Sequence, residues 1–412
     1  MDLLNRELRG SLDFFLDFTN RDPYSPGFGL PADSTKTPAV ASIAGAGFAL
    51  TAWVIGCERG YISPAEARRI VRGTLRTLFH RASHHRGFFA HFLDIQTGLR
   101  WKKCEFSTID TALCLNGVIT AAAYFADDSE IGDLAAQLLE RVDWHFIVFE
   151  TDGRTLFRMS YNPDPDGDYV TDGPGLIGQW DMAAEQKMMY LQAAPRLEPA
   201  LACALYRGFD REWGEYNSHS LIINPQGTLF AYQYPEAWLD TAHFLDSDGV
   251  DWFENTRQAV LANREFCIAQ SGRYRTYHAN SWGLSSGDSP WGYDVFGALP
   301  CRGEPHHNGT VSIYAAAASL PFLPDPVTDM LRYLYRHHPQ TWGRYGFFDA
   351  YNLDVAPAWY SRNVYAINKG CSMIMIENHL TRLVWEVYTG SPYIQKALRV
   401  LGFQPRSGGF GG

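Results

Sequence analysis

The spacing of apolar residues predicts two kinds of helix along the chain. In one kind, apolar side chains recur at helical spacing and charged residues occupy the opposite face; these segments are 63–79, 131–146, 251–269 and 327–335. The other kind is almost free of charge and rich in small residues, in the segments 39–56, 111–126, 183–194, 311–320 and 372 onward. We expect the first kind to face water on one side and the second to be enclosed by protein.

The alternation of these two kinds of helix predicts two concentric layers. Small residues on the inner helices would let them pack closely, as in an α/α toroid whose loops at one end line a central cavity. Strand-like patterns are local, at 155–161, 220–223 and 274–277, and indicate short β-hairpins in the connecting loops. We therefore predict an all-α fold with one catalytic domain at 1–402 and a flexible tail at 403–412.

Composition and charge narrow the class of protein. The chain has 412 residues and a formal net charge of −10, and its low charged fraction of 19% argues against disorder and coiled coil. The acidic balance argues against a nucleic acid or an anionic membrane surface as partner and favours a neutral substrate.

Three further features bear on the compartment. The seven cysteines are scattered without a CxxC motif, which excludes a disulfide scaffold or zinc module as the organising principle. The charge-free stretch 37–57 is long enough to span a bilayer but consists mostly of small residues, so a buried helix in a soluble protein explains it better. The N-terminus is typical of an amphipathic helix rather than a signal peptide, which predicts a cytoplasmic location unless a leader was trimmed.

The long loops combine aromatic residues with carboxylates, which is the chemistry that a neutral, hydroxyl-rich ligand needs. Aromatic faces would cover the C–H side of a sugar, and polar groups would bind its hydroxyls. The alternative for any single ring is that it anchors a loop to the helices. The predicted sugar-binding residues are Trp180, Glu236, Trp238, Trp282, Trp291, Tyr293, Trp342 and Tyr345.

Glycosidic cleavage requires a proton donor and a second carboxylate, and the donor must stay protonated near neutral pH. Glu185 is the first candidate for the donor, because it lies on a predicted charge-poor helix beside two methionines and shortly after Trp180. The alternative is that Asp181 caps this helix and Glu185 only complements its dipole.

Asp110 stands at the start of another charge-free helix, where it would orient a sugar hydroxyl or a water. The alternative is a structural role, because Ser107 and Asp110 have the spacing of a capping box. The predicted candidates for the base side are Asp288, Asp240, Glu236 and Glu377, and further acids in aromatic loops are Asp294 and Asp349.

Histidines occur in small groups, at His84/His85/His91, His306/His307 and His337/His338. None has the spacing of a metal-binding motif, so we interpret them as solvated loop residues and expect no metal and no organic cofactor. The chain has no GxSxG motif, and none of its cysteines lies in a nucleophile motif.

Taken together, the segments resemble the glucoamylase-like (glycoamylase) domain of bacterial endo-β-1,2-glucanases and of the cyclising domain of cyclic β-1,2-glucan synthases. The resemblance covers about residues 12–390, in family order, and is carried by DFFLDFTNRDPYSPGFGLPAD, GFFAHFLDIQTGLR, EFSTIDTALCLNG, IGQWDMAAEQKMMYLQAA, YPEAWLDT, WGLSSGDSPWGYDVFGALP, WGRYGFFDAYN and MIENHLTRLVWEVY.

This resemblance implies an (α/α)6 barrel that acts on β-1,2-linked glucan. It implies that Glu185, in WDMAAEQ, is the general acid and that the Asp110 carboxylate, in STIDTAL, is also important. The family's hydrolases resemble inverting enzymes and its cyclising domains resemble retaining ones. One departure concerns the base: many relatives have an Asp-Gln-Gly-Pro-like sequence where this chain has Asn368-Lys369-Gly370-Cys371.

The sequence therefore predicts an endo-β-1,2-glucanase that inverts the anomeric centre by general acid/base catalysis. Three alternatives stay open. They are a transglycosylase or a hydrolase of another β-glucan or oligosaccharide on the same fold, a non-catalytic glycan-binding toroid, and a sugar isomerase or epimerase on a related toroid. The oligomeric state is open as well.

Overall fold

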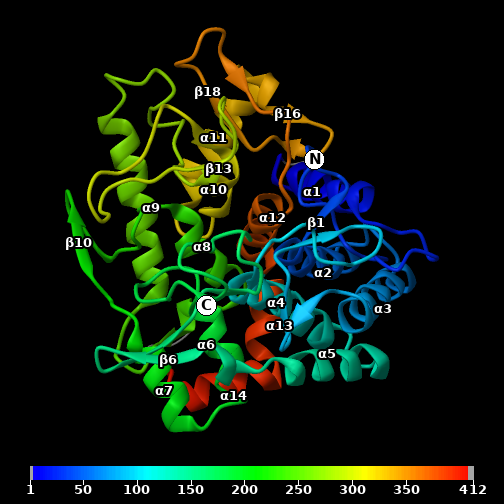
Figure 1. Cartoon of the computed structure of the whole chain (residues 1–412). Helices are drawn as coiled ribbons and strands as arrows, with labels where there is room; N and C mark the ends of the chain where they lie inside the picture. Colours follow the sequence, from blue (N-terminus) through cyan, green and yellow to red (C-terminus); the bar gives the residue numbers. More distant parts are fainter. Residues whose placement is uncertain (1–2, 407–412) are drawn as a thin grey trace.

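The computed structural model describes residues 3–406 and has an all-α fold, with fourteen α-helices in that range. Six charge-poor helices lie in the interior (Figure 1). They are α2 (Ile43–Glu58), α4 (Thr108–Tyr124), α6 (Lys187–Ala193), α8 (Leu229–Trp238), α10 (Ile313–Ala318) and α12 (Ala366–Thr381). Most of their residues are buried, which confirms the prediction that the charge-poor segments are enclosed.

Amphipathic helices cover this interior layer. In α3 (Pro64–His80) the buried residues include Ala67, Ile70, Val71 and Leu78, so one face packs inward and the opposite face carries the charges. Figure 1 shows α3, α5, α7 and α9 at the periphery. The other covering helices are α1 (Leu3–Phe18), α5 (Ser129–Arg141), α7 (Pro199–Gly208), α9 (Trp252–Ala269), α11 (Pro324–His337), α13 (Leu383–Gly390) and α14 (Pro392–Leu401).

Glycine brings α2 and α4 into direct backbone contact. A Cβ atom built on Gly117 would lie 2.1 Å from the carbonyl oxygen of Gly47, a distance at which no side chain fits. Small residues also set the register of α2 and α12, because Gly45 faces Ala366 and Gly370 faces Phe48. These early residues of the two helices face each other, so the helices run in parallel with their N-termini at the same end of the molecule.

Short antiparallel strands connect the helices. Seven sheets have two strands, and they are β1 (Val40–Ser42) with β4 (Phe92–Asp94), β2 (His84–His85) with β3 (Phe88–Phe89), β6 (Val148–Thr151) with β7 (Arg154–Phe157), β10 (Trp213–Tyr216) with β11 (His219–Ile222), β12 (Phe244–Leu245) with β20 (Gln404–Pro405), β13 (Ser286–Gly287) with β14 (Asp294–Val295), and β16 (Trp342–Gly343) with β17 (Gly346–Phe347). Two sheets have three strands, and they are β5 (Phe106–Ser107), β8 (Ser160–Asn162) and β9 (Gly175–Ile177), and β15 (Val311–Ser312), β18 (Ala350–Asn352) and β19 (Trp359–Tyr360).

These strands confirm the predicted hairpins in part. Strand pairs overlap the predicted segments 155–161 and 220–223, but 274–277 forms turns instead. The turn conformation follows from Asp354, whose carboxylate accepts hydrogen bonds from the backbone N–H groups of Arg275 and Thr276. Those groups would otherwise be available for a strand partner.

The described part of the expected tail is packed against the helices. Phe403 is buried in the main core, and Gln404–Pro405 pairs with β12. Residues 407–412 of that predicted tail lie outside the described residues. Of the helices within 3–406, none combines the length and the apolar character that crossing a membrane requires.

Candidate active site

Glu185 lies in an irregular segment immediately before α6, not on a helix as the sequence predicted. The helix begins at Lys187, so the alternative in which Asp181 caps it is wrong. The Asp181 carboxylate instead accepts a hydrogen bond from Gln179 at 3.0 Å. The interpretation of Glu185 as a residue that only complements the dipole of a helix capped by Asp181 therefore does not hold.

Side-chain hydrogen bonds fix the backbone that carries Glu185. The Gln186 amide donates to the Met182 carbonyl at 2.6 Å and accepts from the Ala184 N–H at 2.9 Å. Upstream, the Trp180 indole donates to the Thr108 hydroxyl, in the first turn of α4, at 3.3 Å. The segment is thereby attached to the helix that also carries Asp110.

The Glu185 carboxyl has an environment that favours its protonated form. Its side chain is partly exposed, and within residues 3–406 it makes neither a hydrogen bond nor an ion pair. Loss of hydration raises its pKa to about 8, with a further contribution from the charge of Asp110 and an opposing one from His91. Glu185 therefore holds its proton at neutral pH and remains available to a ligand.

Asp110 has two roles at the start of α4. The Ser107 hydroxyl caps the helix by accepting from the Asp110 N–H at 3.2 Å, and the same hydroxyl donates to the Asp110 carboxylate. The capping geometry is therefore present. It does not exclude a role in the site, because the Asp110 carboxylate also raises the pKa of Glu185.

His91 links the acids around Glu185. Its Nδ1 lies 2.7 Å from Glu105 Oε1, and its Nε2 lies 3.8 Å from Asp110 Oδ2. Burial alone would lower the pKa of His91, but the carboxylates of Asp110, Glu105 and Asp33 outweigh it and raise that pKa to about 9. We call Asp33, His91, Glu105, Asp110 and Glu185 the acid–histidine cluster.

Three members of the acid–histidine cluster offer possible metal ligands, since His91, Glu105 and Asp110 each have a ligand atom within 4.8 Å of the others. A metal would need a free lone pair on one imidazole nitrogen. Here each nitrogen faces a carboxylate, and the pKa of about 9 favours the imidazolium ion. The arrangement fits an ion-paired histidine better than a metal ligand.

A second group of acids consists of Asp288 and Asp349, which we call the carboxylate pair. Asp349 Oδ2 accepts from the Asp288 N–H at 2.7 Å, and Asp349 Oδ1 accepts from the Asn368 amide at 2.8 Å. Burial raises the pKa of Asp349 to about 7, and the neighbouring Asp288 charge contributes to this increase. The Asp288 carboxylate has donors in Ser361, Asn363 and Tyr365.

Two tyrosines connect the acid–histidine cluster with the carboxylate pair. The rings of Tyr293 and Tyr365 lie 4.9 Å apart in an edge-to-face contact. Loss of hydration raises the pKa of both phenols, and the charges of Asp33 and Asp349 both add to it. The backbone also joins the two groups, because the Asp33 carbonyl accepts from the Ala366 N–H at 2.8 Å, two residues before Asn368. Both groups therefore lie at the N-terminal ends of the interior helices.

Three of the predicted base candidates lie elsewhere. Asp240, Glu236 and Glu377 lie towards the C-terminal ends of α8 and α12, whereas Asp110 and Glu185 lie at the N-terminal ends of α4 and α6. Strong ion pairs occupy their carboxylates, so they are not placed as a base opposite Glu185. These pairs are Glu236 with Lys187 at 2.8 Å, Glu377 with Arg59 at 2.8 Å, and Asp240 with Arg382 and with His243.

Burial also corrects several predicted sugar-binding residues. Trp238 and Trp282 are 0% exposed and Trp180 is 7% exposed, so the first two present no ring face to a ligand. Trp238 instead donates to Thr51 at 3.0 Å. Trp291 is 68% exposed and Tyr293 is 43% exposed, so both have rings that a sugar can reach.

The predicted pair Trp342 and Tyr345 packs against α1. The guanidinium of Arg6 lies 5.2 Å from the Trp342 ring centroid, and the Tyr345 hydroxyl donates to Asp17 at 3.0 Å. The structure does not bring these two residues into the acid–histidine cluster.

Sequence reasoning assigned no role to His91 and placed Asp349 only among the further acids of the aromatic loops. The interpretation of His91 as a solvated loop residue is wrong, because it lies between two carboxylates and stacks on Phe92 with ring centroids 3.9 Å apart. A usable signal is that His91 lies in GFFAHFLDIQTGLR, one of the segments that carry the family resemblance. For Asp349 the signal is its position in the aromatic loop WGRYGFFDAYN.

The fold and the acid-rich site define an all-α helical protein of the toroid type. The model of the glycoamylase family, described as "Putative glucoamylase", matches residues 178–392, more than half of the chain. The chain belongs to this family, which confirms the resemblance.

One relative is 28% identical over 392 residues, the exo β-1,2-glucooligosaccharide sophorohydrolase (non-reducing end) of Parabacteroides distasonis. The match covers 86% of this chain and 52% of that protein, so the chain spans about half the length of this relative.

Solved structures share the fold. A crystal structure described as a "putative glucoamylase" from Bacteroides fragilis is 26% identical to this chain in sequence. Its TM-score is 0.83, and the match covers 98% of this chain and 97% of that one. The endo-β-1,2-glucanase of Chitinophaga pinensis, solved with sophorotriose and glucose, is 24% identical, with a TM-score of 0.83 and coverage of 98% of each chain.

Proposed function

We propose that this protein is a glycoside hydrolase that cleaves β-1,2-glucan by general acid/base catalysis. Glu185 donates the proton to the glycosidic oxygen. Asp110 orients a sugar hydroxyl or a water, and Trp291 and Tyr293 contact the sugar rings. The protein needs no metal and no organic cofactor for this chemistry.

The observation that carries this proposal is the state of Glu185. A general acid must be protonated at the working pH and must be free to reach the leaving oxygen. A pKa of about 8, with no hydrogen bond to satisfy the carboxyl within the described chain, meets both requirements. The substrate class is supported by the names of the Parabacteroides relative and of the Chitinophaga enzyme with the same fold.

We further propose that the helices form an (α/α)6 barrel with the substrate bound at the N-terminal ends of the inner helices. The alternation of enclosed and amphipathic helices supports this arrangement, as does the parallel direction of α2 and α12.

The products distinguish the two cleavage modes. An inverting endo-glucanase, which the sequence predicts, releases fragments of several lengths from long β-1,2-glucan. The name of the Parabacteroides relative favours an exo-acting enzyme, which would release sophorose alone. Analysis of early products by chain length, with NMR of the first-formed anomer, separates these modes and also reveals transglycosylation.

The test of the function is the release of reducing ends from linear β-1,2-glucan by wild type and by Glu185→Gln. We expect the variant to remain folded and to lose activity by about 10³-fold. Glu198→Gln is the matched control, because Glu198 is exposed at the start of α7 and should keep wild-type activity. Saturable sugar binding without released reducing ends would instead support a non-catalytic toroid.

A further inference from the structure

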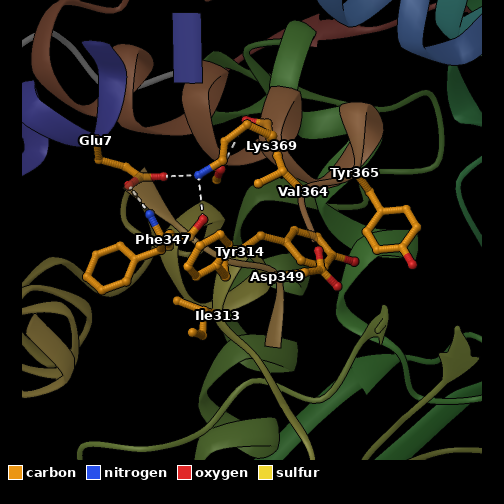
Figure 2. Close-up of a pocket in the computed structure, with 11 residues that line it drawn as sticks. Glu7, Ile313, Tyr314, Phe347, Asp349, Val364, Tyr365 and Lys369 are labelled. Atoms are coloured by element: carbon orange, nitrogen blue, oxygen red, sulfur yellow. Dashed lines mark hydrogen bonds and ion pairs between the residues drawn. The ribbon is translucent and has the colours of Figure 1, made fainter. Parts of the chain in front are cut away.

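Figure 2 shows a buried ion pair between Glu7 and Lys369, which line a small pocket together with Asp349. Lys369 Nζ in α12 donates to Glu7 Oε1 in α1 at 2.6 Å and to the Phe347 carbonyl at 2.7 Å. The second oxygen of Glu7 accepts from the Phe347 N–H at 2.8 Å. Because Phe347 is two residues before Asp349, the ion pair fixes the backbone that carries this acid.

Asp349 and Lys369 also share a small cavity. Its volume is about 10 Å³, which is the room that one water molecule needs, and it is lined by Glu7, Tyr314, Asp349, Tyr365 and Lys369 among others. Figure 2 shows these side chains around one space. Lys369 and Asp349 therefore line one cavity that has room for a single water.

The Asp349 carboxylate accepts fewer hydrogen bonds than the Asp288 carboxylate. A carboxylate has about four lone-pair sites. Asp349 accepts two hydrogen bonds, from Asp288 and Asn368, whereas Asp288 accepts from three side chains. Asn368 is an amide and cannot act as a base, and its Nδ2 is already directed at Asp349.

The geometry points to Asp349 as the proton acceptor of the reaction, positioned by Asn368 and by the buried Lys369–Glu7 pair. This inference rests on the proposed function. In the step, a water oxygen forms a bond to the anomeric carbon while that water loses a proton to Asp349. The bond between the anomeric carbon and the glycosidic oxygen breaks, and the leaving oxygen takes the proton of Glu185.

The charges around Asp349 determine the pH dependence of this step. The groups that face it are Asp288, Lys369 and the phenols of Tyr293, Tyr314 and Tyr365. Only Lys369 is a cation, and its charge lowers the pKa of Asp349 against the larger effect of burial.

The first experiment is the measurement of kcat and KM on linear β-1,2-glucan for Asp349→Asn, with Asp288→Asn for comparison. We expect Asp349→Asn to lower kcat by about 10²- to 10⁴-fold with little change in KM, and Asp288→Asn to lower it less. Glucan binding by calorimetry on the same samples checks that the site has folded. A folded Asp349→Asn variant with kcat within threefold of wild type would overturn the inference.

A second measurement does not depend on that variant. In wild type, the ascending limb of kcat against pH should reflect deprotonation of Asp349, with an apparent pKa of about 7. Replacing both members of the pair, as Lys369→Met with Glu7→Gln, removes the cation without leaving a buried charge unpaired. The ascending limb should then move to higher pH while the descending limb stays; an unmoved ascending limb contradicts the positioning role.

The two hypotheses fail in different ways. If wild type releases no reducing ends from β-1,2-glucan, the proposed function is wrong. If wild type and Glu185→Gln behave as expected but Asp349→Asn stays active, only the assignment of Asp349 is wrong.

Discussion

Glu185 and Glu236 are the same residue type in neighbouring parts of the interior, yet their environments differ. Glu236 is 1% exposed and pairs with Lys187 at 2.8 Å, whereas Glu185 is partly exposed and has no basic partner among the described side chains. Burial raises the pKa of the first carboxylate, but the Lys187 charge and the hydrogen bonds from Lys187 and Thr241 oppose that increase and stabilise its ionised form. The second has no ion-pair partner, so it avoids an uncompensated charge mainly by holding its proton, with an opposing contribution from the His91 charge. The presence or absence of an ion-pair partner thus distinguishes a structural acid from a candidate catalytic acid better than the local sequence does.

The largest expected effect concerns the structural acid. Lys187→Met leaves the Glu236 carboxylate buried without its cation, and we expect the free energy of unfolding to fall by about 3–5 kcal/mol. The measurement is denaturant unfolding followed by circular dichroism. Adding Glu236→Gln should recover part of this loss. An undestabilised Lys187→Met would show that the pair is not structural, and the comparison with Glu185 would fail.

The next effect concerns the pH dependence of stability. The pKa of Glu185 is about 8 in the folded protein against 4.5 for an unperturbed glutamate, so the unfolded state releases this proton first as pH rises. Its contribution to stability is complete below about pH 4.5 and is lost as pH approaches 8.

This dependence can be isolated with Glu185→Gln. Between pH 5 and 8, the stability of wild type relative to the variant should decline by up to about 1.4 kcal/mol per pH unit. The unfolding free energies of both proteins, measured across this range, test the expectation. A flat difference would mean that Glu185 is already ionised in the folded protein at these pH values.

The smallest effect concerns His91, which couples the acids around Glu185. Replacing it by Gln keeps a hydrogen-bonding side chain but removes the positive charge. Since that charge lowers the pKa of Glu185, the descending limb of kcat against pH should move to higher pH. We expect a decrease in kcat of roughly tenfold, about 1.4 kcal/mol, because Asp110 loses its charged neighbour. A lower kcat with an unchanged descending limb of the pH profile would indicate a purely structural role for His91.

The sequence predicted the helical layers well because burial follows the distribution of charge along each segment. It also selected Glu185 and Asp110, whose local segments carry the family resemblance and whose carboxyl groups interact in the structure. It could not separate Glu236 and Glu377 from the site, because their partners Lys187 and Arg59 lie 49 and 318 residues away in the chain. The burial of Trp238 likewise depends on tertiary packing, here against Phe48 at 4.8 Å between ring centroids.

The contact between Gly47 and Gly117 has a consequence for the precision of the site. Two helices that touch main chain to main chain are already at their distance of closest approach, so neither can move towards the other. The loop before α2 supplies Asp33, and the first turn of α4 supplies Asp110. The contact between the helices therefore sets a minimum distance between the two segments that carry these acids. The repulsion that pushes the two carboxylates apart is opposed instead by His91, whose positive charge acts on both of them.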